Sequence, residues 1–501
     1  MFVRKKPNKS GIISVQIVDK SSGKYKMVKT IGSSAEGDEI DRLVAKGEQW
    51  IKDRLGVVEI DFSNTRQFTA EIIDHIEQIN IAGTELLLGN IFNQIGFGQI
   101  PDSMFRRLVL ARLCNPVSKL KTRDYLIRHH SYFIEVQQIY RYLDKLYKKH
   151  KETVQQISYD HTLSVLQGEI NIVFYDVTTL YFEIDHEDEL RKAGYSKDGK
   201  HQHPQIVLGL LVSVDGYPLA YEIFEGNKFE GHTMLPVIDA FKTKHKLEKL
   251  VVIADSGLLS SENIRQLKGK GYEFILGARI KSESRQVKEQ ILRTRLNNGE
   301  SSIINKDDNT RLIITYSDSR AGKDRANREK GLRKLEKQVS TGKLTKASIN
   351  NKGYNKYLKL EGEISITIDR DKYEDDLKWD GLKGYLTNTQ LSKDEIISNY
   401  GHLWKIEKAF RISKNELKIR PIYHRIQRRI EAHLCIAFVA YKIYKELERQ
   451  LKIMDMAISP EKAIEIAETI YAIRVKISGE IITKTLLLTE EQKYLAKMFD
   501  F

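Results

Sequence analysis

Two aspartates lie in apolar segments that are expected to be buried, where an ionised side chain is unfavourable unless it has a function. Asp176 sits in the middle of the apolar run NIVFYDVTTLYFE (171–183), and Asp255 ends the run VVIAD (251–255). An ionised, unpaired carboxylate in a protein interior costs several kcal/mol, so each residue needs a partner for its charge. Both aspartates are therefore candidate site residues.

The two aspartates are expected to lie together. A carboxylate at the carboxyl end of a buried strand points into the crevice where open α/β sheets hold ligands. The strand that contains Asp176 is the expected neighbour of the strand that Asp255 ends. Two facing carboxylates repel unless a divalent cation lies between them, and Mg²⁺ prefers oxygen ligands and phosphate. The pair therefore predicts a magnesium site.

A third acid lies on a helix expected over 395–417, after the capping box SKDE that begins at Ser392. Tyr400, Glu407 and Lys414 are spaced seven residues apart, so they share nearly one face of this helix. The flanking residues are Trp404, Phe410 and Arg411. A glutamate beside buried aromatic rings needs a partner, and metal ions shared with the two aspartates would supply it.

The elements that must position these acids follow from the periodicity of apolar residues. Three antiparallel strands are expected, with the hairpin signal Asp215-Gly216 between the last two: 171–183, 205–214 and 217–224. Helix, strand, helix and strand should follow, over 233–245, 249–255, 261–270 and 272–279. This is the order of an RNase H-like mixed sheet with helices on its faces, so the expected fold class is α/β, or α+β overall.

The rest of the chain is expected to surround this core. The segment 105–126, amphipathic, basic and interrupted at Pro116, suits a helical bundle or a DNA-binding module equally. The stretch 320–359 is rich in Lys and Arg, and its charges contact phosphates or are solvated. The expected domains are a β-hairpin (1–38), a helical DNA-binding region (39–166), the first part of the core (167–280), a basic inserted subdomain (281–390), the core helices (391–450) and a helical tail (451–501).

Composition narrows the class of protein. The 501 residues carry a formal net charge of +14, which favours a polyanionic partner, nucleic acid first, although solubility alone is the simpler reading. Only Cys114 and Cys435 occur, without CxxC spacing, which suits a reducing cytoplasm. No apolar run approaches the ~20 residues of a membrane span, and no phosphate-binding loop for ATP is found.

The late helix resembles the signature of DDE transposases of bacterial insertion sequences, in the branch marked Tyr-x2-Arg-x3-Glu-x6-Lys. Tyr400, Glu407 and Lys414 match it, whereas Leu403 stands at the arginine position. His402, Lys405 and Arg411 are candidates to replace that arginine. The phrases YDVTT, GYSKDGK, FEGNKFEGHT and ADSGLLSSENI also look like this family, so the likeness spans about 160–450.

The resemblance implies an RNase H-like core that transfers phosphoryl groups with two Mg²⁺ ions, or Mn²⁺, held by Asp176, Asp255 and Glu407. The nucleophile would be water and then a 3′-hydroxyl, the substrate double-stranded DNA, and the working form a homodimer that pairs two ends. The residues expected to touch DNA are Tyr400, Lys405, Arg411, Lys414, Lys197 and Lys200. Trp404 either stacks on a flipped base or packs in the core.

Other readings stay open. An RNase H-like nuclease would take an extra carboxylate from Glu230, and a DNA-binding relative would have kept the fold without catalysis. Asp255 could serve only as a helix cap, and Glu407 could pair with Arg411 on an exposed face. The pair His201 and His203 lacks further ligands for zinc.

Overall fold

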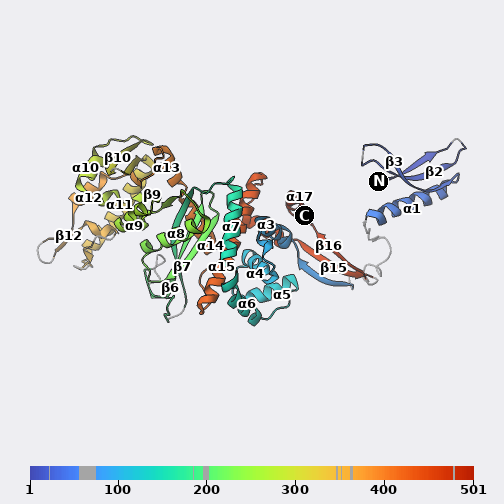
Figure 1. The fold of residues 1–501 in the computed structure, drawn as a ribbon, viewed down its shortest axis with the longest axis horizontal. Helices are drawn as coiled ribbons and strands as arrows, with labels where there is room; N and C mark the ends of the chain where they lie inside the picture. The colour runs from blue at the N-terminus through green and yellow to red at the C-terminus, as the bar shows by residue number, and fades with distance from the viewer. Residues whose placement is uncertain are drawn as a thin grey trace. The chain divides into compact units, whose positions relative to one another are not determined.

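The computed structural model forms two compact units, each described by itself (Figure 1). One unit comprises Met1–Gln78 with Arg474–Thr483, and the other Ile79–Ile473 with Lys484–Phe501. The structure describes residues 1–8, 10–21, 23–55, 75–183, 186–195, 202–307, 309–342, 344–345, 348–350, 353–361, 365–477 and 480–501. Within these residues, no helix is both long and apolar enough to cross a membrane.

The first unit holds a three-stranded antiparallel sheet. Its order is β1 (Phe2–Pro7), β2 (Ile13–Asp19) and β3 (Lys26–Ser34). Helix α1 (Gly37–Leu55) buries Ile40 and Ile51 and packs on the sheet. The predicted hairpin is formed by β2 and β3, and β1 adds a strand that was not expected. The segment FVRKKP has no clear alternation, so only its pairing with the edge of β2 makes it a strand.

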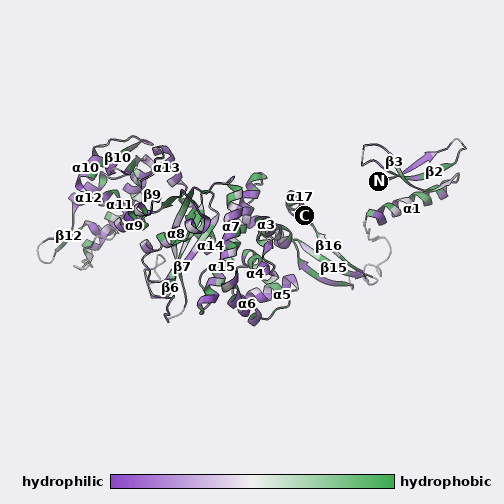
Figure 2. Cartoon of the chain, in the orientation of Figure 1, coloured by the Kyte–Doolittle hydropathy of each residue, from purple (hydrophilic) through white to green (hydrophobic). Residues whose placement is uncertain are grey.

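Helices dominate the start of the second unit. They are η1 (Glu85–Gly89), α3 (Asn90–Ile95), η2 (Phe97–Gln99), α4 (Ser103–Cys114), α5 (Lys119–His130), α6 (Val136–Lys149) and α7 (Lys151–Val165). The break between α4 and α5 contains Pro116, as predicted. Several of these helices pack on the long α15 (Gln427–Ile453), which is buried on most of its circumference. Along the helices, hydrophobic residues alternate with hydrophilic ones (Figure 2).

Two segments expected to be helical contain strands instead. β4 (Ile76–Ile81) lies within the region expected to be helical, and the tail holds β15 (Tyr471–Ile477) and β16 (Glu480–Leu486) between α16 (Pro460–Glu468) and α17 (Glu490–Phe499). The three strands form a sheet of order β16-β15-β4. YAIRVKI alternates apolar with polar residues, which is the strand pattern that the expectation overlooked. IEQINI and EIITKTL are rich in β-branched residues but do not alternate regularly.

The predicted order of the central sheet is confirmed. β5 (Ile172–Tyr181), β6 (Gln205–Ser213) and β7 (Pro218–Glu225) are antiparallel, and β8 (Val251–Ala254) and β9 (Glu273–Ala278) run parallel to β5. The spatial order β9-β8-β5-β6-β7 is that of an RNase H-like sheet. The helices α8 (Met234–His245) and α9 (Ser261–Gly269) connect β7, β8 and β9 along the chain.

The predicted insertion extends the same sheet. Its strands β10 (Ser301–Asp307), β11 (Thr310–Tyr316) and β14 (Leu382–Thr387) continue the sheet beyond β9, with β14 next to β9. The other elements are η5 (Ile280–Ser282), α10 (Arg285–Arg293), α11 (Asp318–Ser340), η7 (Gly353–Tyr357), β12 (Leu358–Glu361), β13 (Ser365–Ile368) and α12 (Arg370–Leu377). Leu335, Tyr357 and Leu358 form a small separate core among them. The sheet therefore has eight strands, mixed in direction, with helices packed against it.

The single helix expected over 395–417 is two helices. α13 (Lys393–Gly401) starts at the predicted capping box of Ser392 and Glu395, and α14 (Trp404–Asn415) follows after a short break. At the break, Leu403 N–H donates to the carbonyl of Tyr400 at 3.0 Å, a tighter turn than that of an α-helix. Because a glycine in a helix interior is unfavourable, Gly401 is a natural end for α13.

Candidate active site

Asp176 and Asp255 lie next to each other on neighbouring strands. β5 and β8 pair in parallel with Tyr175 opposite Ala254, and each aspartate is the next residue along the chain. Strands in a sheet are about 4.8 Å apart, so the two residues are adjacent where β8 ends. Asp176 accepts a hydrogen bond from the N–H of Val177 at 2.7 Å. Asp255 is also the N-cap of η4 (Ser256–Leu258), and its side chain accepts from the N–H of Ser256. The residue therefore caps a helix and also lies beside Asp176.

The alternation of β5 directs Asp176 to the sheet face that α14 covers. Tyr175 and Val177 belong to the core that contains α8, whereas Phe174 belongs to the core that contains Ile406 of α14. Successive side chains of a strand point to opposite faces. Asp176 therefore points to the same side of the sheet as α14, where the third predicted acid is found.

Tyr400 connects α13 to Asp255. Its phenol oxygen lies 3.4 Å from Asp255 Oδ1, and its side chain is buried. Burial raises the pKa of Tyr400 and the charge of Asp255 raises it further, so the phenol keeps its proton and is the donor. An added Cβ on Gly277 of β9 would collide with Tyr400 Oη and come within 3.0 Å of the Ser256 nitrogen. Glycine at position 277 thus leaves room for the tyrosine.

The charges of Asp255 and Glu407 both act on Lys383 of β14. Glu407 lies in the first turn of α14 and is exposed. Burial lowers the pKa of Lys383 and Arg320 lowers it too, whereas Asp255 and Glu407 both raise it. The Lys383 ammonium also lies over the ring of Tyr400, 4.6 Å from its centroid. Sequence reasoning missed this lysine because it follows Leu382 in an otherwise ordinary strand of the insertion.

The three carboxylates have the chemistry of a site for a divalent cation, since all their donor atoms are oxygens. Asp255 and Glu407 make no ion pair with any residue that the structure describes. Within the same residues, no three His, Cys, Asp or Glu side chains are grouped closely enough to hold a metal ion by themselves. The residue types therefore fit Mg²⁺ or Mn²⁺, and coordination by all three would require the carboxylates to draw closer together.

Comparison with known proteins identifies the family of the chain. The model of the family described as Transposase DDE domain matches residues 167–443, which is more than half of the chain. The chain belongs to this family. All three acids lie in the matched range. No curated protein matches the chain.

Two solved structures of transposases resemble this family member at low identity. The piggyBac transposase synaptic complex with hairpin DNA is 11% identical, has a TM-score of 0.37, and aligns over 79% of this chain and 77% of its own. The Mos1 transposase paired-end complex with left transposon end is 12% identical, has a TM-score of 0.16, and aligns over 46% of this chain and 66% of its own.

Other residues singled out on α13 and α14 of this transposase-family chain have different surroundings. Trp404 is 52% exposed, which excludes core packing, and Arg411 is exposed. Lys405 donates to the carbonyl of Val214 and lies 3.7 Å from Asp215. The alternative ion pair between Glu407 and Arg411, two described residues, is not formed.

The position of the family arginine is filled by an apolar side chain. Leu403 is buried in the core shared by α14 and the sheet, and Lys414 is half-buried. The predicted DNA contacts Lys197 and Lys200 lie outside the described residues, as does His201.

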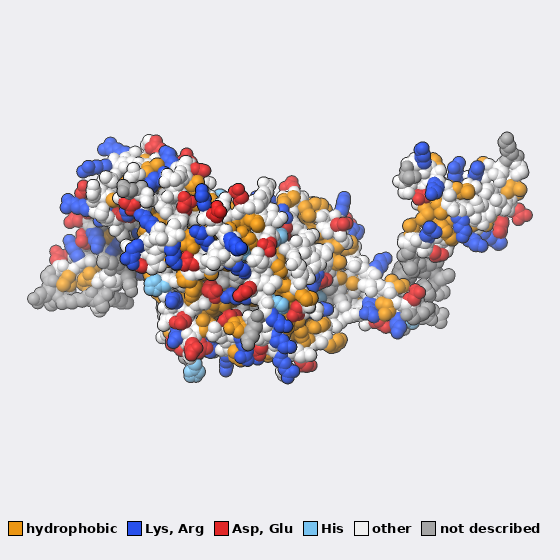
Figure 3. Space-filling model, viewed as in Figure 1, with side chains coloured by type: hydrophobic (Ala, Val, Ile, Leu, Met, Phe, Trp, Pro, Cys, Tyr) orange, Lys and Arg blue, Asp and Glu red, His pale blue; other side chains and the backbone are white. Residues whose placement is uncertain are grey.

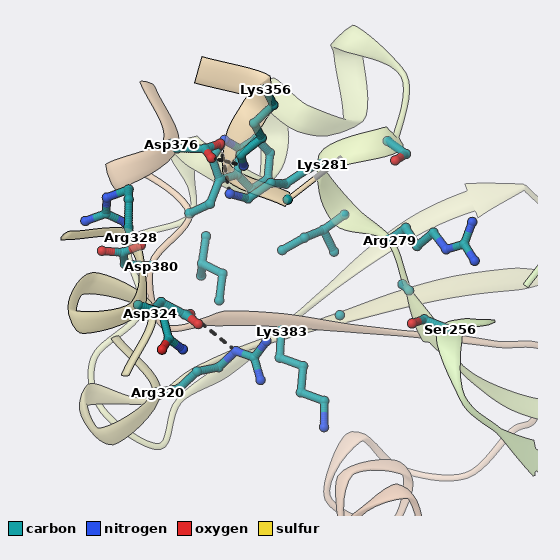
Figure 4. Close-up of a pocket in the computed structure, with 18 of the residues that line it drawn as sticks. Ser256, Arg279, Lys281, Arg320, Asp324, Arg328, Lys356, Asp376, Asp380 and Lys383 are labelled. Atoms are coloured by element: carbon teal, nitrogen blue, oxygen red, sulfur yellow. Dashed lines mark hydrogen bonds and ion pairs between the residues drawn. The ribbon is translucent and has the colours of Figure 1, made fainter. Parts of the chain in front are cut away.

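A cavity of about 640 Å³ begins beside these acids, at Ser256 and Lys383, and extends among η5, α11, η7 and α12 (Figure 4). Most of its charges are paired: Arg320 lies 3.6 Å from Asp324 and Lys281 2.9 Å from Asp376. Further Lys and Arg side chains are prominent over α10–α12 (Figure 3). The insertion therefore brings cations to the edge of the candidate site.

Proposed function

We propose that this transposase-family chain cleaves and joins DNA at the ends of a bacterial insertion sequence by metal-dependent phosphoryl transfer. The observation that carries the proposal is the position of Asp176 and Asp255 side by side at the end of β8, with Tyr400 3.4 Å from Asp255 Oδ1. Lys383 lies over the Tyr400 ring, and Glu407 is in the first turn of α14, the helix on the sheet face to which Asp176 points. The net charge of +14 suits a DNA substrate.

The proposed roles follow from position. Asp176, Asp255 and Glu407 would hold two Mg²⁺ ions, or Mn²⁺, which when bound activate water or a 3′-hydroxyl and stabilise the leaving oxygen. Tyr400 holds the carboxylate of Asp255 in place through its hydroxyl, because the phenol is buried and faces that acid. Lys383 offsets the combined negative charge of Asp255 and Glu407.

DNA would be contacted by the exposed flank of α14. Trp404 and Arg411 present a large ring and a guanidinium to solvent, a combination that suits stacking on a base beside a phosphate contact. Lys405 and Lys414 lie on the same helix, and Lys197 and Lys200 belong to the proposed DNA surface by sequence alone. Two copies of the chain would pair two ends in a homodimer, in the bacterial cytoplasm where the DNA lies.

The test is cleavage of a DNA duplex that carries the inverted repeats flanking the gene, with purified protein and Mg²⁺ or Mn²⁺. Asp255→Asn and Glu407→Gln should each lower the cleavage rate about 1,000-fold, because each removes a charge that metal-assisted transfer requires. Glu416→Gln, an exposed change beyond the end of α14, is the matched control and should cleave normally. Full activity of Glu407→Gln would overturn the proposal.

A nuclease that uses Glu230 is the second candidate. Glu230 begins η3 (Glu230–His232), and its charge, like that of Asp176, raises the pKa of Tyr175 beyond the rise that burial causes. Glu230 is thus within electrostatic reach of the strand that carries Asp176. Loss of cleavage in Glu230→Gln, with full cleavage in Glu407→Gln and no strand transfer by the natural chain, would favour the nuclease. Metal-independent DNA binding without any cleavage would favour an inactive relative.

A further inference from the structure

A second cavity, remote from the three acids in sequence, lies among the α4–α5 turn, α6, the segment after α14 and α15. Its volume is about 570 Å³. We call it the Arg112–Lys119 pocket, after two buried cations that line it; its other lining residues include Ser118, Tyr140, His424 and His433. Lys121, Lys418 and Arg420 add further positive charge to its lining.

The two cations are buried, and neither forms an ion pair with a described residue. Arg112 is 5% exposed and Lys119 is 4% exposed. The Arg112 Nε has no hydrogen-bond partner, and the described contact of its guanidinium is a long one, 3.5 Å to the carbonyl of Leu417. Lys119 makes no hydrogen bond or ion pair with its side chain to any described residue. Buried charges are ordinarily paired, because an unpaired one costs several kcal/mol.

No carboxylate lines this pocket. Asp144 is close enough to influence His424, but its oxygens are held by Arg428 and Arg429, each at 2.8 Å. Burial lowers the pKa of Lys119, and the neighbouring charge of Arg112 lowers it further. Water could accept their hydrogen bonds, but it would not offset the repulsion between two cations.

Other donors face the same space. Ser118 is the N-cap of α5, a helix of 12 residues, so the free N–H groups and the positive end of the helix dipole are at the pocket. The unpartnered Arg112 Nε is a buried donor at the same place, whereas His433 donates from Nε2 to the carbonyl of Ile419, so its Nδ1 is an acceptor and adds no donor. Cations, a helix N-terminus and a buried unpaired donor are the features of a site for an oxyanion.

We propose that the Arg112–Lys119 pocket binds a phosphate group. A phosphate dianion or a phosphodiester would pair with both buried cations and accept hydrogen bonds from the start of α5. If the chain acts on DNA as proposed above, the natural source is a backbone phosphate, and the pocket then anchors DNA at a point separate from the site of cleavage. The alternative source is free phosphate or a small phosphorylated molecule.

The first arm of the test uses inorganic phosphate and the full-length protein, without metal or DNA. About 10 mM phosphate should raise the midpoint of thermal unfolding by about 1 °C or more relative to chloride at equal ionic strength. Lys119→Met should lose this rise, and without phosphate its midpoint should equal or exceed that of the natural chain, since an unpaired charge is gone. Lys145→Met, an exposed lysine on the neighbouring α6, is the matched control and should keep the rise.

The second arm distinguishes the two sources of phosphate. With a DNA backbone phosphate in the pocket, Lys119→Met should weaken binding of a DNA duplex about tenfold and lower the slope of log affinity against log salt by about 1. A rise in midpoint with unchanged DNA binding would assign the pocket to free phosphate and overturn the DNA source. No rise in the natural chain, or an equal rise in Lys119→Met, would overturn the pocket itself. If Lys119→Met does not fold, Lys119→Gln takes its place.

Failure of this inference can be told from failure of the proposed function. The phosphate arm contains no metal and no DNA, so its result does not depend on catalysis. Conversely, loss of cleavage in Asp255→Asn leaves the phosphate arm unchanged, because Asp255 does not line the pocket.

Discussion

Placing a methyl group on Gly277 should disrupt the contact that holds Asp255. The added Cβ of Gly277→Ala would collide with Tyr400 Oη and lie 3.0 Å from the Ser256 nitrogen and 3.3 Å from Ser256 Cβ. Because Tyr400 is buried, its ring has little space into which to withdraw. The phenol must therefore leave Asp255, or η4, which begins at Ser256, must shift.

The magnitude follows from these contacts. Overpacking of this kind costs about 1–3 kcal/mol, and loss of the hydrogen bond to Asp255, long at 3.4 Å, adds about 1 kcal/mol. Tyr400→Phe removes the colliding oxygen, so Gly277→Ala should cost less in that background, and only the contact with Ser256 remains. The expected coupling between the two changes is about 1–2 kcal/mol, and the rate of DNA cleavage in Gly277→Ala should fall about tenfold.

The assay is a double-mutant cycle on the full chain, read by the midpoint of thermal unfolding and by DNA cleavage. Gly401→Ala is the matched control, because Gly401 directly follows Tyr400 and an added Cβ there meets nothing within 4 Å. Additive effects of Gly277→Ala and Tyr400→Phe would refute the reasoning, since they would mean that the methyl group and the phenol do not compete for space.

Three further predictions concern stability and are read from thermal unfolding. Asp102→Ala should cost about 1 kcal/mol, because the carboxylate caps α4 by accepting from Met104 N–H at 3.0 Å; a midpoint equal to that of the natural chain would contradict the cap. Burial, together with the charges of Lys119 and Arg112, holds the pKa of His424 at about 3 in the folded chain. Below about pH 6.5 the unfolded chain therefore binds a proton that the folded chain does not. The free energy of unfolding should fall by up to about 1.4 kcal/mol per pH unit as pH drops toward 3. His424→Asn, in phosphate-free buffer, should show a shallower fall, and an equal one would refute the assignment. Asp376→Asn should destabilise the chain by about 1–3 kcal/mol. Burial alone would raise the pKa of Asp376, but hydrogen bonds from Lys356, Tyr357 and Lys281 outweigh burial and hold this pKa at about 2. An unchanged midpoint would show that these donors find water equally well.

The order of strands and helices along the sequence was sufficient to predict the strand order of the central sheet and the adjacency of Asp176 and Asp255. The antiparallel set β5-β6-β7 followed by helix, strand, helix and strand has few ways to pack, because connections are short and parallel crossovers have one hand. Asp176 and Asp255 could be placed next to each other for the same reason. Local signals also predicted the capping box at Ser392 and the break at Pro116.

Local signals failed where pairing with a distant segment decides the structure. β1, β4 and β16 lack a regular alternation of apolar and polar residues, so their conformation depends on a neighbouring strand more than on their own residues. The insertion was expected as a separate subdomain, yet nothing in the sequence of β14 indicates that it pairs with β9 and extends the sheet. That pairing is what brings Lys383 to Tyr400.

By itself, the sequence determined which carboxylates this protein offers and on which elements they lie, since strand alternation and helix spacing are local properties of the chain. Only the tertiary structure decided what surrounds them, such as the space that Gly277 leaves for Tyr400 and the Lys383 ammonium over the ring of Tyr400. It also decided that Arg112 and Lys119 are buried without an acidic partner. These features depend on contacts between residues far apart in the chain. Burial and charge pairing are properties of such contacts, and no spacing rule encodes them.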